Sequence, residues 1–382
     1  MSLARERAAP RGSPDRGLRR VTLVVFAAGL LVSLAAVSVT GVRAGGDTPR
    51  YTRAAERILA GELPRENKAQ AYLGFAVVLA AVVAVTGRAE AVVALNTVAF
   101  GLTTLAVFAL GHRLFGQPAA LLGAGLLLIN LELAFWSAYL LPETLYSALL
   151  ALAVWSTCVA GGRRGAAYGW AAVALLSTAF VRPNGWVMLP VAATYWLGRR
   201  RAIWSALGLG ACLAAAAVVP VFREAIQAEA PEQNLLRGTV IWGSDAWRVA
   251  MPPPERPPVD WLDGIAYVLA HPVASVRLFL TRIGVEVLHA RPFYSTAHNL
   301  IVVLFYLPLY GLAVAGYRSS SRRSEVRLLA AAVLAHLAVV GLTFADWDGR
   351  FLLHVVPLVT VLAGGGAAAL AHRLAAVARP TR

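Results

Sequence analysis

Apolar stretches separated by short polar loops run through almost the whole chain. A bilayer core about 30 Å thick is crossed by roughly 20 consecutive apolar residues in a helix. Such stretches recur from Val21 to Ala371, and they predict an all-α, polytopic helical membrane protein with about 10 transmembrane helices. The predicted spans are 21–42, 91–110, 119–140, 143–160, 166–181, 186–198, 202–222, 299–317, 327–345 and 351–371.

A further apolar stretch, 70–86, is assigned from the charges of the loops. Arg-rich loops stay in the cytoplasm, and the tail 1–20 and the loops 161–165 and 199–201 are all rich in Arg. A crossing by 70–86 would place loop 161–165 outside. This stretch is therefore predicted to lie as a helix on the outer membrane surface.

One alternative places the Arg-rich loops on the same side of the membrane. In it, 119–140 is a re-entrant segment broken near Asn130 and Glu132 rather than a span. Both arrangements place the N-terminus and the C-terminus in the cytoplasm, because the tail after His372 is also basic.

This topology divides the chain into four parts. They are a cytoplasmic basic tail at 1–20, an N-terminal transmembrane module at 21–222, an outer loop or cap at 223–298, and C-terminal transmembrane helices with a cytoplasmic tail at 299–382. The first outer loop, 43–90, belongs to the N-terminal module.

Each outer segment contains one helix with an apolar face. In the first loop, the apolar residues follow helical spacing and predict an amphipathic helix lying on the membrane: Tyr51, Ala54, Ala55, Ile58 and Leu59. In the cap, an amphipathic helix is expected over 271–289.

Composition excludes a soluble globular protein. Of the 382 residues, 58% are hydrophobic and 14% are charged, and the mean hydropathy is +0.64. A formal net charge of +15 would suggest nucleic acid as the partner of a soluble protein, but here the Arg residues lie in short loops, so topology accounts for it. Cys158 and Cys212 lie in separate apolar stretches and offer neither a disulfide framework nor a metal site.

Charged residues from distant segments are expected to meet on the outer face. Four short motifs follow one another along the chain at outer ends of spans: Gly46-Asp47-Thr48-Pro49-Arg50-Tyr51, Leu141-Pro142-Glu143, Val181-Arg182-Pro183 and Gly349-Arg350-Phe351. Their order and membrane side resemble the GT-C glycosyltransferases. The pattern is most similar to families 39 and 83, the protein O-mannosyltransferases and the lipid A aminoarabinose transferases. That resemblance implies a helical membrane domain with two surface helices in its first outer loop.

The same resemblance implies two catalytic acids. Asp47 occupies the place of the family's catalytic base, and Glu143 that of a second acid in the same cavity, where Asp is commoner. The residues alone leave simpler interpretations open. Asp47 can be a helix cap, and a carboxylate at a helix N-terminus such as Glu143 is stabilised by the helix dipole.

The resemblance also implies substrate-binding residues. Lys68 falls where the aminoarabinose branch has a phosphate-binding lysine, although Ala69 replaces the proline that usually follows. Arg182 and Arg350 take the places of phosphate-contacting cations, and snorkelling to the interface is the alternative for them. Further substrate contacts are assigned to these residues: Arg50, Tyr51, His298 and Asn299. For Arg50 the alternative is the wet face of the helix, and for His298 and Asn299 an interfacial polar belt.

The expected activity follows from the side of the membrane on which the charged residues are predicted to lie. Nucleotide sugars are made in the cytoplasm and do not diffuse out, so an outward-facing transferase needs a polyprenyl-phosphate-linked sugar as donor. We expect an inverting glycosyltransferase of the cell membrane whose acceptor is a lipid, a glycan or a protein. Membrane lipids are expected partners. No nucleic acid partner, no cofactor and no obligatory metal is expected. A lipid-linked glycan polymerase or ligase and a lipid or solute transporter are the alternatives.

Overall fold

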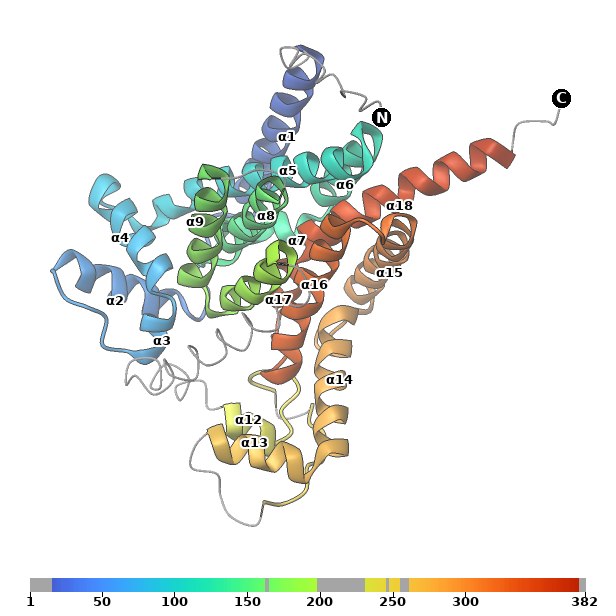
Figure 1. Cartoon of the computed structure of the whole chain (residues 1–382). Coiled ribbons are helices and arrows are strands. Elements are labelled where there is room, and N and C mark those ends of the chain that lie inside the picture. Colours follow the sequence, from blue (N-terminus) through green and yellow to red (C-terminus); the bar gives the residue numbers. More distant parts are fainter. Residues whose placement is uncertain (1–15, 162–164, 198–230, 245–246, 255–260, 378–382) are drawn as a thin grey trace, which may run out of the picture.

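The computed structural model describes residues 16–161, 165–197, 231–244, 247–254 and 261–377. In these parts the fold is helical, with three isolated β-bridges (Figure 1). The N-terminal half contains α1 (Arg16–Thr40), α2 (Thr48–Leu59), α3 (Asn67–Ala71), α4 (Leu73–Thr86), α5 (Val92–Phe115), α6 (Gln117–Leu128), α7 (Leu131–Phe135), α8 (Glu143–Ala160) and α9 (Ala166–Val181). The C-terminal half contains α12 (Pro231–Leu236), α13 (Trp261–Ala270), α14 (Pro272–Leu288), α15 (Thr296–Ser320), α16 (Ser324–Leu342), α17 (Arg350–Leu353) and α18 (Val356–Val377).

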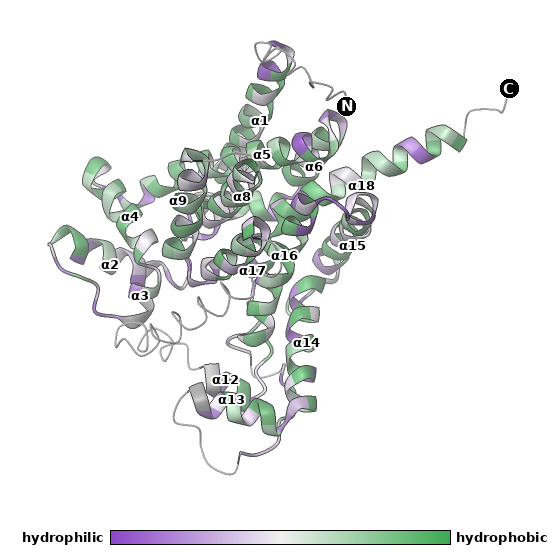
Figure 2. Cartoon of the chain, in the orientation of Figure 1, coloured by the Kyte–Doolittle hydropathy of each residue, from purple (hydrophilic) through white to green (hydrophobic). Residues whose placement is uncertain are grey.

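The chain is a helical membrane protein. Six helices in the described part are long and apolar enough to cross a bilayer, and two bent pairs raise this number to eight if each is one span. In Figure 2 the green of hydrophobic residues predominates on most of these helices, with white and purple stretches between. The expected number of about 10 stays a prediction, because 202–222 lies outside the described residues.

Helices α1 and α5 run antiparallel. Ser33 donates a hydrogen bond to Thr97, and Gly29, one turn before Ser33 on α1, packs against Gly101, one turn after Thr97 on α5. The chain therefore leaves α1 and enters α5 at the same end of the bundle. This agrees with the expectation that 70–86 does not cross the membrane, since α4 connects the two.

The segment 119–140, predicted as a span with a re-entrant segment broken near Asn130 and Glu132 as the alternative, is a bent pair of helices. Helix α6 ends at Leu128, and the chain then bends by 61° into 131–138. Asn130 causes the break, because its side-chain oxygen accepts the backbone N–H of Leu133 and so begins a new helix. The Tyr139 backbone then pairs with Arg43 beyond the end of α1. The polar break predicted near Asn130 is present, and the broken segment still reaches the far end of the bundle.

Most of the apolar face of α2 is covered by protein. Tyr51, Ala54 and Ala55 are buried, and Tyr51 meets the ring of Phe75 on α4 at 5.1 Å between centroids. The amphipathic helix was predicted correctly, and its position on the membrane stays a prediction, since Leu59 at the end of its apolar face is 47% exposed.

Three consecutive glycines let α18 pass through the centre of the bundle. Gly364 packs on Ala119 of α6, Gly365 on Phe115 of α5, and Gly366 on Leu312 of α15. Small residues allow transmembrane backbones to approach closely, and packing of this kind drives helix association in lipid. From Val356 to Gly366 every residue of α18 is buried, and its last turns project away from the bundle (Figure 1).

This packing predicts that Gly366→Leu destabilises the fold. A Cβ at Gly366 would lie 1.9 Å from the carbonyl oxygen of Leu312, so α15 and α18 must separate. Overpacking typically costs about 1–3 kcal/mol, and backbone contacts make this site severe. Gly311→Leu is the matched control, because nothing lies within 4 Å of a Cβ there. The melting temperature in detergent should fall for Gly366→Leu only, and equal values would contradict the central role of α18.

The described residues between 231 and 289, which fall in the predicted cap, are held against α16 and α17 by a small core and by one buried arginine. In this core, Val240, Ile241 and Val285 pack with Val340 at the end of α16 and Phe351 on α17. On α14, which forms where 271–289 was predicted, Arg282 donates hydrogen bonds to four backbone carbonyls, those of Asn234, Thr239, Gly341 and Leu342. The cap is therefore tied to the end of α16, directly before the loop that carries Arg350.

Candidate active site

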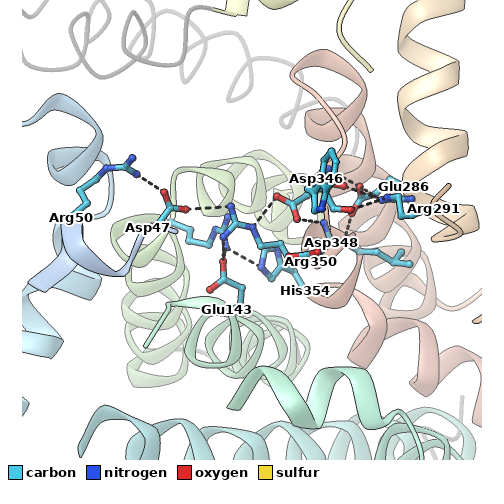
Figure 3. Close-up of polar contacts among 12 residues, drawn as sticks. Asp47, Arg50, Glu143, Glu286, Arg291, Asp346, Asp348, Arg350 and His354 are labelled. Atoms are coloured by element: carbon cyan, nitrogen blue, oxygen red, sulfur yellow. Dashed lines mark hydrogen bonds and ion pairs between the residues drawn. The ribbon is translucent and has the colours of Figure 1, made fainter. Parts of the chain in front are cut away.

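Charged side chains from four distant segments meet where α1 ends and α8 begins (Figure 3). Asp47 precedes α2, Glu143 opens α8, Arg182 follows α9, and Arg350 opens α17. Each lies at a helix end where Pro or Gly interrupts the helix, which leaves the side chain free to point across the bundle. The sequence predicted this convergence, and the structure shows it.

Arg350 is the centre of this cluster. Its guanidinium donates to Asp346 Oδ1 at 2.9 Å, to Asp47 Oδ2 at 3.3 Å and to Glu143 Oε1 at 3.4 Å. Burial alone would lower the pKa of Arg350, but the carboxylates of Asp346, Glu143 and Asp47 raise it, so the group stays charged. One cation thus fixes three acids that are far apart in sequence.

Arg182 forms the buried floor of the cluster. Its side chain is 2% exposed, and it donates to Glu143 Oε1 at 2.7 Å. The same nitrogen lies 3.1 Å from His354 Nε2, which must accept because a guanidinium has no acceptor. The rings of Tyr72, Tyr146 and Phe351 lie within cation–π distance of the guanidinium. A direct contact of Arg182 with substrate stays a prediction, and what the structure shows is an arginine that orients Glu143.

Asp47 faces the open side. It is 26% exposed, and its two oxygens contact Arg50 at 2.9 Å and Arg350 at 3.3 Å. It occupies the N-cap position of α2, but its side chain makes no capping hydrogen bond. The carboxylate is thus directed into the cluster instead of stabilising its own helix. Three carboxylates and three guanidinium groups balance one another here: Asp47, Glu143 and Asp346 with Arg50, Arg182 and Arg350.

The loop carrying Arg350 is positioned by α14. Glu286 is fully buried and accepts the backbone N–H groups of Asp346 at 3.0 Å and Leu352 at 2.8 Å. Gly349 has a φ of +66° and packs on the ring of His289, where a Cβ would lie 2.0 Å from Nδ1. Only glycine fits this approach and this left-handed backbone. Helix α14 and His289 after it therefore set the position of Arg350.

Tyr51 is a structural part of the site in this structure. It is 2% exposed and packs between Tyr72 and Phe75. Burial raises the pKa of its hydroxyl well above the ordinary value, so Tyr51 is protonated at neutral pH.

Two of the remaining predicted residues, His298 and Asn299, do not join the cluster. Lys68 lies on α3, and its side chain is outside the described part of the structure. His298 is exposed and stacks on Tyr294. The amide of Asn299 binds the backbone N–H and C=O of Arg291, at 2.9 and 2.8 Å. Asn299 is thus a local clamp in this structure.

Several members of the cluster were not assigned to the site from sequence. Asp346 was given no role from the sequence, although its place four residues before Arg350 was an available signal. His354 lies in an apolar run, and Tyr72 and Tyr146 look like ordinary core residues. Nothing in the sequence distinguishes them, because their role depends on where Arg182 lies. In the described part of the chain, no group of three or more His, Cys, Asp or Glu side chains is arranged to hold a metal ion.

The fold and the site define a polytopic helical membrane protein with a polar centre at one end of the bundle. No family model and no curated protein matches the sequence. Among solved structures, the chain is similar to the archaeal oligosaccharyltransferase AglB from Archaeoglobus fulgidus, determined in complex with an inhibitory peptide and a dolichol-phosphate. The TM-score is 0.54 at 14% identity, and the match covers 96% of this chain and 53% of that one. The chain therefore spans about half the length of that protein, and the likeness is one of fold.

Proposed function

We propose that this chain is an integral membrane glycosyltransferase that moves a sugar from a polyprenyl-phosphate-linked donor to an acceptor on the extracytoplasmic face. The observation that carries the proposal is the cluster in which Arg350 joins Asp47, Glu143 and Asp346. Support comes from a fold shared with an oligosaccharyltransferase whose structure contains a dolichol-phosphate. The motifs that resemble families 39 and 83 are also the residues that meet in the cluster.

In this mechanism Asp47 is the general base. Its carboxylate takes the proton of the acceptor hydroxyl as the hydroxyl oxygen attacks the anomeric carbon of the sugar. The bond between that carbon and the phosphate oxygen breaks, and the lipid phosphate leaves with the electron pair. Because attack and departure occur on opposite faces, the configuration inverts.

Cations at the cluster stabilise the leaving phosphate. Arg350 is 20% exposed, so it reaches the open side while its carboxylate partners hold it. Together with Lys68 and Arg50, it offsets the charge that grows on the phosphate as the bond breaks. Arg182 keeps Glu143 in place, and Glu143 orients the sugar or the acceptor.

Labelled donor lipid in liposomes tests the activity. Purified protein should form a new glycosidic bond when donor and acceptor are both supplied, and the lipid phosphate should be released in equal amount. Movement of labelled lipid between leaflets without bond formation would instead indicate a transporter. Repeated addition to a lipid-linked glycan would indicate a polymerase, which shares the donor chemistry.

The orientation of the site is a separate prediction. In a background without Cys158 and Cys212, a cysteine at Arg88 or Pro253 should react with an impermeant thiol reagent in intact cells, and one at Arg322 should not. Arg88 lies between α4 and α5, so its labelling tests whether α4 crosses the membrane. Arg322 lies between α15 and α16, at the opposite end of the bundle. Protection of Arg88→Cys with labelling of Arg322→Cys would invert the topology and place the cluster in the cytoplasm.

A further inference from the structure

An aromatic surface adjoins the site on the side of the cap. Two ring pairs form it, and we call it the aromatic platform: Phe293 with Trp347, and Tyr294 with His298. The first pair is stacked at 4.0 Å between centroids and 6° between planes, and the second at 4.1 Å and 3°. Phe293 is 41% exposed and Trp347 is 40% exposed. These are large rings left open to the surroundings.

The platform is held in place before any ligand arrives. Arg291 Nε donates to the carbonyl of Trp347 at 3.1 Å, which joins the segment 291–299 to the loop before α17. The amide of Asn299 binds both backbone groups of Arg291, and the Tyr294 hydroxyl donates to the carbonyl of Asp348 at 3.4 Å. Ordering these rings therefore costs a ligand little conformational entropy.

The loop 346–350 links the platform to the proposed catalytic cluster. Trp347 lies between Asp346, which binds Arg350, and Asp348, whose backbone N–H donates to Asp346 Oδ2 at 3.0 Å. A ligand seated on Trp347 is thus three residues away from Arg350 in the chain. Asp348 is itself exposed, so carboxylate oxygens and open ring faces occur together.

Carboxylates beside the rings argue against a membrane anchor. Aromatic belts lie at the level of lipid headgroups, where Lys and Arg, and not Asp, complement anionic lipids. Partial desolvation and the neighbouring Asp346 raise the pKa of Asp348, so another anion is a poor fit at this place. What fits is a ligand with an apolar face and neutral hydrogen-bond donors at its edge.

A sugar ring has this chemistry. Its axial C–H groups form a flat apolar face that packs on an aromatic ring, and its equatorial hydroxyls donate hydrogen bonds to carboxylates. We propose that the aromatic platform binds the acceptor, and that the acceptor is a neutral glycan. This inference rests on the proposed function, because it places the acceptor hydroxyl beside the Asp47–Arg350 cluster. An acidic glycan would be repelled by Asp346 and Asp348.

Direct binding measurements test the platform without relying on transfer. The full-length protein in nanodiscs is titrated with a neutral mannose or glucose oligosaccharide, a glucuronate-containing oligosaccharide and an unglycosylated peptide, followed by saturation-transfer NMR. Only the neutral oligosaccharide should bind. Trp347→Ala should weaken its binding about five- to tenfold, from the loss of one stacking surface, and Trp347→Phe should retain most of it.

The control is Trp170→Ala on α9, where a tryptophan that is 72% exposed lies outside the platform. It should leave oligosaccharide binding unchanged. Equal melting temperatures of the variants would exclude unfolding as the cause, and Trp347→Phe decides the question if Trp347→Ala does not fold. No binding of the neutral oligosaccharide, unchanged binding in Trp347→Ala, or Trp347-dependent binding of the peptide or the acidic sugar would each overturn the proposal.

Failure of the platform and failure of the proposed function give different results. Transfer of sugar to peptide with full activity in Trp347→Ala would leave the glycosyltransferase standing and remove the platform as its acceptor site. Oligosaccharide binding that depends on Trp347, without transfer from any lipid-linked donor, would support the platform as a glycan site and contradict the proposed glycosyltransferase. In a working transferase, Trp347→Ala should raise the KM for the glycan and leave donor affinity unchanged.

Discussion

Replacing Asp47 by Asn is expected to abolish sugar transfer while the protein still folds and binds its donor. Asparagine has nearly the same size and shape, and its side-chain oxygen can still accept from Arg350. What it cannot do is take the proton of the acceptor hydroxyl. General-base catalysis typically contributes a factor of about 10² to 10⁴. The measurement is the rate of transfer from a polyprenyl-phosphate donor by wild type and variant in matched preparations.

A structural role for Asp47 predicts a different result. The side chain makes no capping hydrogen bond to α2, and asparagine caps helices about as well as aspartate. A merely structural Asp47 would therefore tolerate the change with less than about a tenfold loss of rate. Glu62→Gln is the control, because Glu62 is exposed and pairs with Arg57 at 2.5 Å on the same loop, and neither residue belongs to the cluster. Near-normal turnover in Asp47→Asn would remove this residue from the mechanism.

Much of the site could be predicted because its residues lie at helix ends. Pro142 before Glu143, Pro183 after Arg182 and Gly349 before Arg350 interrupt apolar runs, and each interruption brings a charge to a membrane surface. A charge at such a place is costly unless it has a partner. The parity of the spans then places these ends on one side. Convergence thus follows from local signals and a count of crossings.

The partners that fix the site could not be predicted in this way. Glu286 binds the backbone of Leu352, which is 66 residues away, and the sequence shows only a polar position on α14. His354 contacts Arg182 across 172 residues. Contacts of this kind depend on how helices pack against one another. Neither the charges of the loops nor the spacing of apolar residues predicts that packing. The support behind Arg350 is for this reason visible only in the structure.

The packing of the helices could likewise be predicted only in part. An apolar face on α2 indicates burial, but the pattern does not say whether lipid or protein covers it, and here Tyr51 packs on α4. Asn130 and Glu132 marked the break in 119–140 because polar groups inside a membrane need partners. Asn130 donates to the Tyr306 hydroxyl, and Glu132 lies 2.7 Å from His289 Nε2. Both partners belong to the C-terminal half, so the break is also where the two halves meet.

Arg350→Gln is expected to have the second large effect, on activity and stability together. The change leaves Asp47, Glu143 and Asp346 without the cation they share, and two of these acids are buried. Removing one partner of a buried ion pair typically costs about 3–5 kcal/mol. Transfer should fall to background, because Asp47 loses its orientation and the leaving phosphate loses a cation. The melting temperature should fall as well.

Arg350→Lys separates the two roles of this residue. Lysine restores one positive charge, so much of the stability should return, but a single ammonium cannot reproduce the planar fork that reaches three carboxylates. Transfer should therefore stay low while the melting temperature recovers. Arg53→Gln on the exposed face of α2 is the matched control, since its pair with Glu66 is open to solvent and such pairs contribute about 0–1 kcal/mol. If Arg350→Lys restored transfer in proportion to stability, Arg350 would be a structural cation, and the phosphate of the donor would have to be held by other residues.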